Sequence, residues 1–84
     1  MSSHVVLWSV VKAMLDHCAG GWTDKLHTHN RFVFFNGKTF NRIPLGEHGR
    51  RKDVEIELGH VRQMVRQLGI NEACAKSQIP LLKF

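Results

Sequence analysis

Two histidines, His27 and His29, stand two positions apart in this 84-residue chain, and Arg31 follows at the same interval. An imidazole can accept or donate a proton near neutral pH, because its unperturbed pKa is about 6.5. A guanidinium can hold a phosphate through two parallel hydrogen bonds. RNA carries its own nucleophile, the 2′-hydroxyl, so its cleavage needs only a base, an acid and cations around the phosphorus. These residue types therefore suit metal-independent cleavage of an RNA phosphodiester.

The same spacing allows other interpretations. Side chains two residues apart on a strand point to the same side, so His27 and His29 could also be two ligands of a metal ion. No cysteine or third ligand stands at a known spacing, and we predict neither a metal nor another cofactor. A histidine beside a loop is also commonly a surface hydrogen-bonding residue. His48, in the segment that follows, is a further candidate for the acid.

Positive charge is concentrated in the middle of the chain. The formal net charge is +5, and residues 25–52 contain seven cations but a single acid. The seven cations are Lys25, Arg31, Lys38, Arg42, Arg50, Arg51 and Lys52. This concentration favours a polyanionic partner, either a nucleic acid or an acidic protein. The run 50–52 is interpreted as a loop that attracts phosphates, with a merely solvated run as the alternative.

Much of this charge belongs to a predicted β-hairpin. Residues 31–35 and 38–43 are rich in residues that favour strands, and Asn36-Gly37 between them is typical of a type I′ turn. A two-residue loop fixes the register, which pairs Phe35 with Lys38, Val33 with Phe40, and Arg31 with Arg42. Two facing arginines repel each other unless an anion lies between them, so this register favours a phosphate site.

Alternation divides the hairpin side chains between two faces. Phe32, Phe34 and Ile43 share the more apolar face, which we predict the helices cover. The other face takes His29, Arg31, Phe35, Lys38, Phe40 and Arg42. On that second face the two arginines would hold a phosphate, and the two phenylalanines would stack on unpaired bases. The alternative is that the C-terminal residues cover both rings.

The rest of the chain predicts an α+β domain. A helix follows the candidate N-caps Ser2 and Ser3 and stops at Gly20-Gly21, and a short strand runs over residues 22–26. A second helix begins near residue 57 and ends at Gly69-Ile70. Residues 1–70 then form one α-β-β-β-α sandwich, a three-stranded antiparallel sheet with two helices on one face. Residues 71–84 are a C-terminal tail that either packs on this domain or docks on a partner.

Three features of this order resemble the HicA-type (YcfA-like) mRNA interferase toxins. They are Gly21-Trp22 after the first helix, Thr28-His29 with Phe32 three residues after the histidine, and the closing helix GHVRQMVRQLGI. The resemblance spans roughly residues 6–70. It implies a fold like that of double-stranded-RNA-binding domains, cleavage of mRNA by a strand histidine, and a HicB-like antitoxin as partner. It places the catalytic role on His29, although the family usually has Gly-Ser before that histidine and often a second histidine after it.

Two further functions remain open. The chain could be a non-catalytic RNA- or DNA-binding domain that uses the same basic face. It could instead be a protein-interaction domain that docks an acidic partner without any nucleic acid. The sequence does not determine the oligomeric state.

The expected location is the cytoplasm. The two cysteines are far apart, and Cys18 lies on the apolar side of the first helix, so we expect a buried thiol. The first residues do not show a signal-peptide pattern. No run approaches the roughly 18 apolar residues that cross a bilayer, so we expect no membrane partner.

Overall fold

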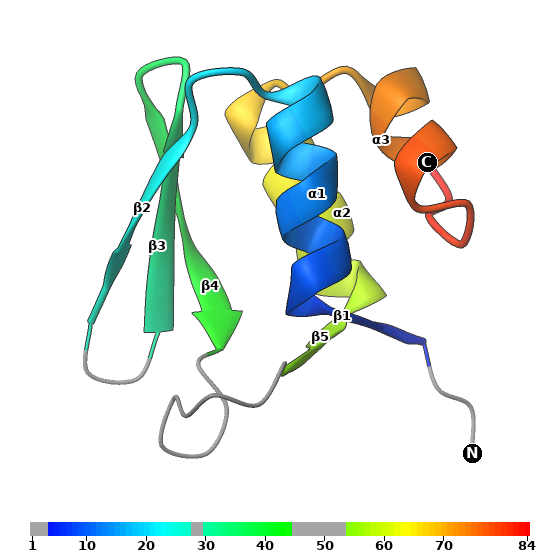
Figure 1. Cartoon of the computed structure of the whole chain (residues 1–84), viewed down its shortest axis with the longest axis horizontal. Helices are drawn as coiled ribbons and strands as arrows, with labels where there is room; N and C mark the ends of the chain where they lie inside the picture. Colours follow the sequence, from blue (N-terminus) through cyan, green and yellow to red (C-terminus); the bar gives the residue numbers. More distant parts are fainter. Residues whose placement is uncertain (1–3, 28–29, 45–53) are drawn as a thin grey trace.

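The computed structural model describes residues 4–27, 30–44 and 54–84. Its elements are β1 (Val5–Leu7), α1 (Trp8–Cys18), β2 (Thr23–Leu26), β3 (Asn30–Phe35), β4 (Lys38–Pro44), β5 (Glu55–Glu57), α2 (Leu58–Leu68) and α3 (Glu72–Gln78). Strands β2, β3 and β4 form an antiparallel sheet with β3 in the centre, and α1 and α2 lie on one of its faces (Figure 1). The predicted α+β class with a three-stranded antiparallel sheet is confirmed.

The hairpin turn forms as predicted. Asn36 and Gly37 both have positive φ, 57° and 74°, which a type I′ turn requires. Near the turn, Phe35 pairs with Lys38, as the two-residue loop implies. Farther along the strands the register shifts between Arg31 and Val33. Between these pairs, Asn41 and Arg42 of β4 lie opposite the single residue Phe32 of β3, which is a β-bulge.

This bulge makes the predicted arrangement of the hairpin faces wrong. Arg31 pairs with Ile43 instead of Arg42, so the two arginines do not face each other. The additional residue also reverses the alternation, which turns Ile43 to the same side as Val33 and Phe40. All three are at most 1% exposed and belong to the core. The helices therefore cover the face of Val33 and Phe40.

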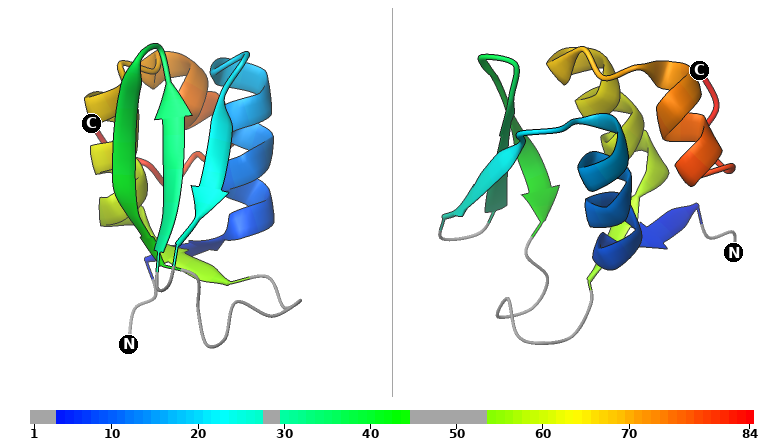
Figure 2. Two further views of the ribbon diagram at one scale, coloured as in Figure 1. Left: turned by 90° about the vertical axis from the view of Figure 1, so that its left-hand side faces the viewer. Right: turned by 45° about the horizontal axis from the view of Figure 1, so that its top comes forward.

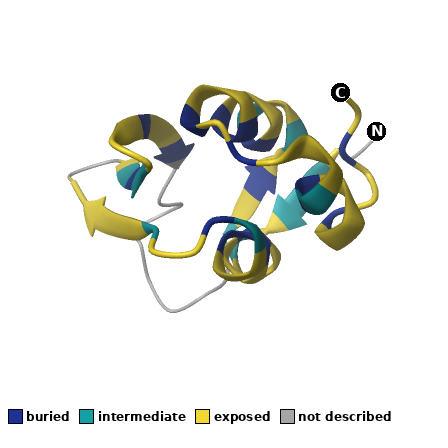
Figure 3. Cartoon of the chain, turned by 90° about the horizontal axis from the view of Figure 1, so that it is seen from above, coloured by how far each residue is buried: buried dark blue, intermediate teal, exposed yellow. Residues whose placement is uncertain are grey.

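The core lies between the sheet and the helices (Figure 3). It takes one side of each long helix, because the buried residues recur at helical spacing. The helical members are Val11, Met14 and Leu15 of α1 and Val61, Met64, Val65 and Leu68 of α2. These two helical patterns were visible in the sequence. They fix which sides of α1 and α2 face the sheet.

The first helix begins later than predicted. Residues 5–7 form β1, which pairs with β5, so α1 starts at Trp8 and not after the serines at positions 2 and 3, which lie outside the described residues. Neither long helix has a side-chain N-cap. Instead, the Trp8 amide donates to the carbonyl of Val54, and the Leu58 amide donates to that of His4, both at 2.8 Å. The residue before each of the two strands thus supplies an acceptor for the first turn of the helix that follows the other strand.

The helix ends agree with the sequence analysis. Gly21, after α1, has a φ of 89°. Gly69 ends α2 in the left-handed conformation, and the Ile70 amide donates to the carbonyl of Val65 at 2.9 Å. This is a Schellman arrangement, and it ends the helix at the predicted Gly69-Ile70.

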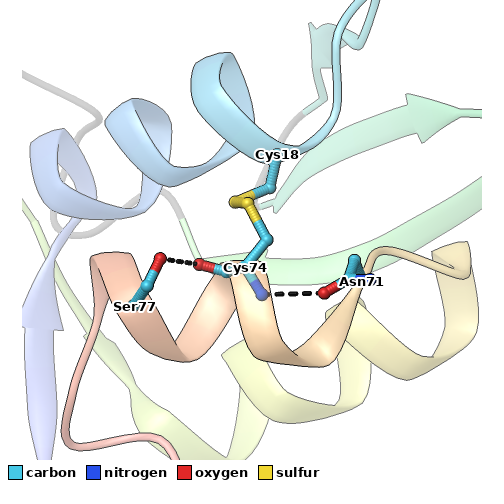
Figure 4. The surroundings of a disulfide bond; sticks show 4 residues. All are labelled: Cys18, Asn71, Cys74 and Ser77. Atoms are coloured by element: carbon cyan, nitrogen blue, oxygen red, sulfur yellow. Dashed lines mark hydrogen bonds between the residues drawn. A yellow bond between two sulfur atoms is a disulfide. The ribbon is translucent and has the colours of Figure 1, made fainter.

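The C-terminal residues pack on the domain. Helix α3 lies against α1, and Ile79 and Leu82 are buried in the core. A disulfide joins Cys18, the last residue of α1, to Cys74 (Figure 4). The expected free thiol at Cys18 is therefore wrong. The Asn71 side chain caps α3 by accepting from the Cys74 amide at 2.8 Å, which helps to hold Cys74 opposite the end of α1.

Candidate nucleic-acid interface

The sheet face turned away from the helices carries a cluster of aromatic rings. His27, directly after β2, stacks on Phe32 with ring centroids 4.2 Å apart and ring planes 24° apart. The Phe34 ring lies 6.5 Å from that of Phe32. No described helix lies over this face, as the left view of Figure 2 shows. We call it the outer face, with the members Thr23, Lys25, His27, Phe32, Phe34 and Thr39.

Strand pairing brings the members of the outer face together. Lys25 of β2 pairs with Phe32, and Phe34 pairs with Thr23 on one side and Thr39 on the other. Directly opposed residues of an antiparallel pair project from the same face. Lys25 and His27 are exposed, whereas both phenylalanines are half-buried. The outer face thus offers rings on which bases can stack, a cation for phosphate and an accessible imidazole.

Arg31 projects to the other side of the sheet, toward α1. It pairs with Leu26, and its guanidinium forms a salt bridge with Asp24 of β2. The guanidinium carbon also lies 4.4 Å from the centre of a Trp8 ring, a cation–π contact. The Arg31 side chain is 20% exposed. It links the sheet to α1, and the predicted pairing of Arg31 with Arg42 around a phosphate is not found.

Two tryptophans support this contact of Arg31. The rings of Trp8 and Trp22 meet edge to face with centroids 6.2 Å apart. The indole N–H of Trp22 donates to a carboxylate oxygen of Asp16 at 2.7 Å. Both tryptophans pack against the core, as their apolar positions in the sequence suggest.

Lys38 and Arg42 lie at the edge of the sheet, next to α2. Lys38 sits beside Gly69 at the end of the helix. Arg42, in the bulged part of β4, lines an open pocket of about 480 Å³. We call it the edge pocket, and its lining residues are Arg42, Gln63, Arg66 and Gln67. The cations of β4 are therefore separated from His27 by the width of the sheet.

The two phenylalanines predicted to stack on bases face the helices. Phe40 is 1% exposed and Phe35 packs against the core. Helix α2 packs on β4, so a helix covers this side of the strand. The prediction that Phe35 and Phe40 stack on bases is wrong. The bulge turns Ile43 to their side of the hairpin, so their face is the more apolar one and the helices cover it.

Several predicted site residues lie outside the described residues. They are His29, His48, Arg50, Arg51 and Lys52. Their proposed roles stay predictions. Of the predicted site residues that the structure describes, His27 is the one on the outer face. It lies there with Phe32, Phe34 and Lys25, which the sequence analysis did not assign to the site.

The sequence contained a signal for the residues that were missed. Val33 and Phe40 were predicted to pair. Two apolar residues that face each other on neighbouring strands favour burial of the sheet face from which they project. Assigning that face to the core would have left Phe32 and Phe34 outside. Pairing the short strand 23–26 with β3 would then have added Lys25.

Two further properties bear on the function. Among the described residues, no three His, Cys, Asp or Glu side chains gather closely enough to hold a metal ion. In the same part of the chain, no helix has the length and apolarity to cross a membrane.

No protein-family model, curated protein or solved structure matches this chain. The resemblance to the HicA-type toxins thus rests on the order and spacing of residues within the chain. The outer face and the charges around it are the features of the described residues that bear on the function.

Proposed function

We propose that this chain binds single-stranded RNA on the outer face and cleaves it there, as an mRNA-cleaving toxin of the HicA type. One observation carries the proposal, the stacking of His27 on Phe32 at 4.2 Å. It puts a proton carrier next to a ring that can stack on a base, on a sheet face that no described helix covers. Stacking on aromatic rings is a common way for proteins to bind unpaired bases.

The chemistry needs no group beyond RNA and this chain. A histidine base removes the proton of a 2′-hydroxyl, and the 2′-oxygen attacks the adjacent phosphorus. The bond from phosphorus to the 5′-oxygen breaks, and a second histidine protonates the leaving oxygen. The products are a 2′,3′-cyclic phosphate and a 5′-hydroxyl. His27 and His29 take the two proton roles, and Lys25 stabilises the charge on the phosphorane oxygens.

The order of elements supports the family part of the proposal. The series α1, β2, β3, β4, α2 is the order that the resemblance implies for a fold like that of double-stranded-RNA-binding domains. The ribbon of β1 and β5 and the helix α3 would be additions to that fold. As a toxin of this type the chain would act in the cytoplasm, with a HicB-like antitoxin protein as its inhibitory partner.

A second candidate, a non-catalytic RNA- or DNA-binding domain, is favoured by the position of Arg31. Asp24 neutralises this guanidinium on the helix side of the sheet. Lys25 is then the cation that the described residues contribute to the outer face. One lysine and three rings are sufficient for stacking on bases but supply less stabilisation for a cleavage transition state.

Incubation of the purified protein with mRNA tests both candidates. We expect fragments with 2′,3′-cyclic phosphate ends, formed equally well with and without a chelator. Salt-dependent binding without fragments would favour the non-catalytic domain, since phosphate contacts give a steep slope of log affinity against log salt. If the protein neither cleaves nor binds RNA, both candidates are contradicted. The protein-interaction domain is then the function that remains.

Replacing Phe32 with alanine is expected to weaken the binding of single-stranded RNA about tenfold to a hundredfold, because a stacked base contributes about 1–3 kcal/mol. The fold should persist, since Phe32 is outside the core. Fluorescence anisotropy with a labelled oligonucleotide measures the affinity. Leu81→Ala is the control, because Leu81 is 61% exposed in the C-terminal residues. Equal affinities of the two variants would argue against stacking at Phe32.

A further inference from the structure

The edge pocket gathers hydrogen-bond donors outside the outer face. Arg42 and Arg66 contribute two guanidinium groups, which only donate, and Gln63 and Gln67 contribute two amides. No carboxylate is among the lining residues. The volume of about 480 Å³ is in the range of small-ligand sites, which hold about 300–1,000 Å³. The pocket thus has the size and the donors for one phosphate with its sugar.

Both sides of the pocket are positioned by the fold. The β-bulge takes Arg42 out of the regular alternation of β4. The Arg42 side chain lines the pocket together with side chains of α2. On α2, residues 63, 66 and 67 lie on one side of the helix, because residues three and four apart are neighbours. The Gln67 amide donates to the carbonyl of Thr39 at 2.6 Å, which ties this side of α2 to the edge strand.

One guanidinium is also partly oriented in advance. The Nε of Arg66 lies 3.4 Å from a carboxylate oxygen of Glu72, at the start of α3. This contact uses one edge of the guanidinium and leaves other N–H groups for a ligand. A side chain that is already oriented loses less conformational entropy when it binds an anion. Arg42 is exposed and supplies a second positive charge to the same pocket.

We propose that the edge pocket is a phosphate-binding subsite for the RNA backbone, a proposal that rests on the proposed function. Arg42 and Arg66 bring two positive charges to the pocket, the Glu72 carboxylate offsets that of Arg66 in part, and a bound phosphate would pair with the remaining charge. The sheet is three strands wide, so β2 and β4 are about 10 Å apart, two inter-strand spacings. A strand of RNA stacked on the outer face reaches the edge pocket by crossing the edge of β4. Donors from four side chains around one open pocket match a single phosphate, whereas an acidic protein surface would have to spread over a larger area.

A titration with inorganic pyrophosphate tests the pocket without RNA. In a nuclear magnetic resonance experiment on the full chain, the side-chain amide signals of Gln63 and Gln67 are expected to shift. The shifts should be lost in Arg42→Gln/Arg66→Gln and weakened in Arg42→Gln. They should be kept in Arg62→Gln, which removes one positive charge, as Arg42→Gln does, but from an exposed position of α2 outside the pocket. Arg42→Gln alone serves if the double variant fails to fold, because Arg42 is an exposed residue of β4.

The same variants are then measured with single-stranded RNA. The double variant is expected to bind about tenfold to a hundredfold more weakly, the effect of losing charge-assisted hydrogen bonds. The slope of log affinity against log salt should fall by about 0.7, the share of one phosphate contact. Arg62→Gln should bind with nearly wild-type affinity.

The outcomes separate this subsite from the proposed function. Pyrophosphate shifts without any RNA binding would support an anion site and contradict RNA as its ligand. RNA binding with no pyrophosphate shift, and no difference between the double variant and Arg62→Gln, would overturn the subsite and leave the outer face intact. Stronger shifts with polyglutamate than with pyrophosphate would overturn it in favour of an acidic protein.

Discussion

Replacing His27 with phenylalanine is expected to slow RNA cleavage about 10²- to 10⁴-fold while RNA affinity stays close to that of the wild type. The loss follows because a positioned general acid or base contributes a factor of that size. The affinity is kept because phenylalanine can preserve the stack on Phe32, in which the ring centroids are 4.2 Å apart. Single-turnover cleavage at saturating RNA gives the rate constant, and anisotropy gives the affinity.

Two variants serve as comparisons for this result. His27→Ala should lose both cleavage and part of the affinity, because it removes the ring as well as the nitrogens. His29→Ala should abolish cleavage and preserve binding, as the family resemblance implies. A wild-type cleavage rate in His27→Phe would leave His27 as a stacking residue only. Undiminished cleavage by His29→Ala would remove His29 from the mechanism.

Removing the disulfide is expected to lower the free energy of unfolding by about 4 kcal/mol. The bond joins residues 56 positions apart, and the entropy of closing a loop of that length accounts for about this amount. The effect is large for a small domain, whose stability is about 5–15 kcal/mol. Cys18→Ser/Cys74→Ser should therefore unfold at markedly lower urea concentration than the oxidised wild type.

Reduction of the wild type supplies the matched experiment. A reductant should shift the urea midpoint of the wild type toward that of the double serine variant, and it should not shift the variant itself. The proposed function places the chain in a reducing cytoplasm, where disulfides rarely persist, so that proposal requires the reduced form to fold and act. If the fully reduced wild type unfolds at the same midpoint as the oxidised protein, the bond does not stabilise the domain.

Local patterns predicted much of the fold. The Asn36-Gly37 turn, the stop of α2 at Gly69-Ile70 and the apolar sides of α1 and α2 depend on residues close in sequence, and all are present in the structure. The bulge in β4 was not predictable in the same way. It depends on how Ile43 packs beneath the helices, and a single additional residue has no distinct local pattern.

The errors in the site follow from that one residue. Strict alternation placed Ile43 with Phe32 and Phe34, which made their face seem the more apolar of the two. With the bulge, Ile43 joins Val33 and Phe40, and the outer face keeps the two remaining rings. Alternation within β3 was correct, and only the choice of the buried face was wrong. That choice depends on contacts between distant segments.

The pairing of the cysteines was hidden for a related reason. Cys74 meets Cys18 only because α3 folds back against α1, with Ile79 and Leu82 in the core. The spacing of two cysteines does not reveal such packing.

The central claim is that RNA lies on the outer face, and nuclear Overhauser effects between RNA and the protein test it most directly. With a short single-stranded oligonucleotide, base and ribose protons should show contacts to the rings of Phe32 and Phe34 and to the imidazole of His27. Contacts confined to exposed residues of α1, such as Lys12 and His17, with none to the three rings, would contradict the account.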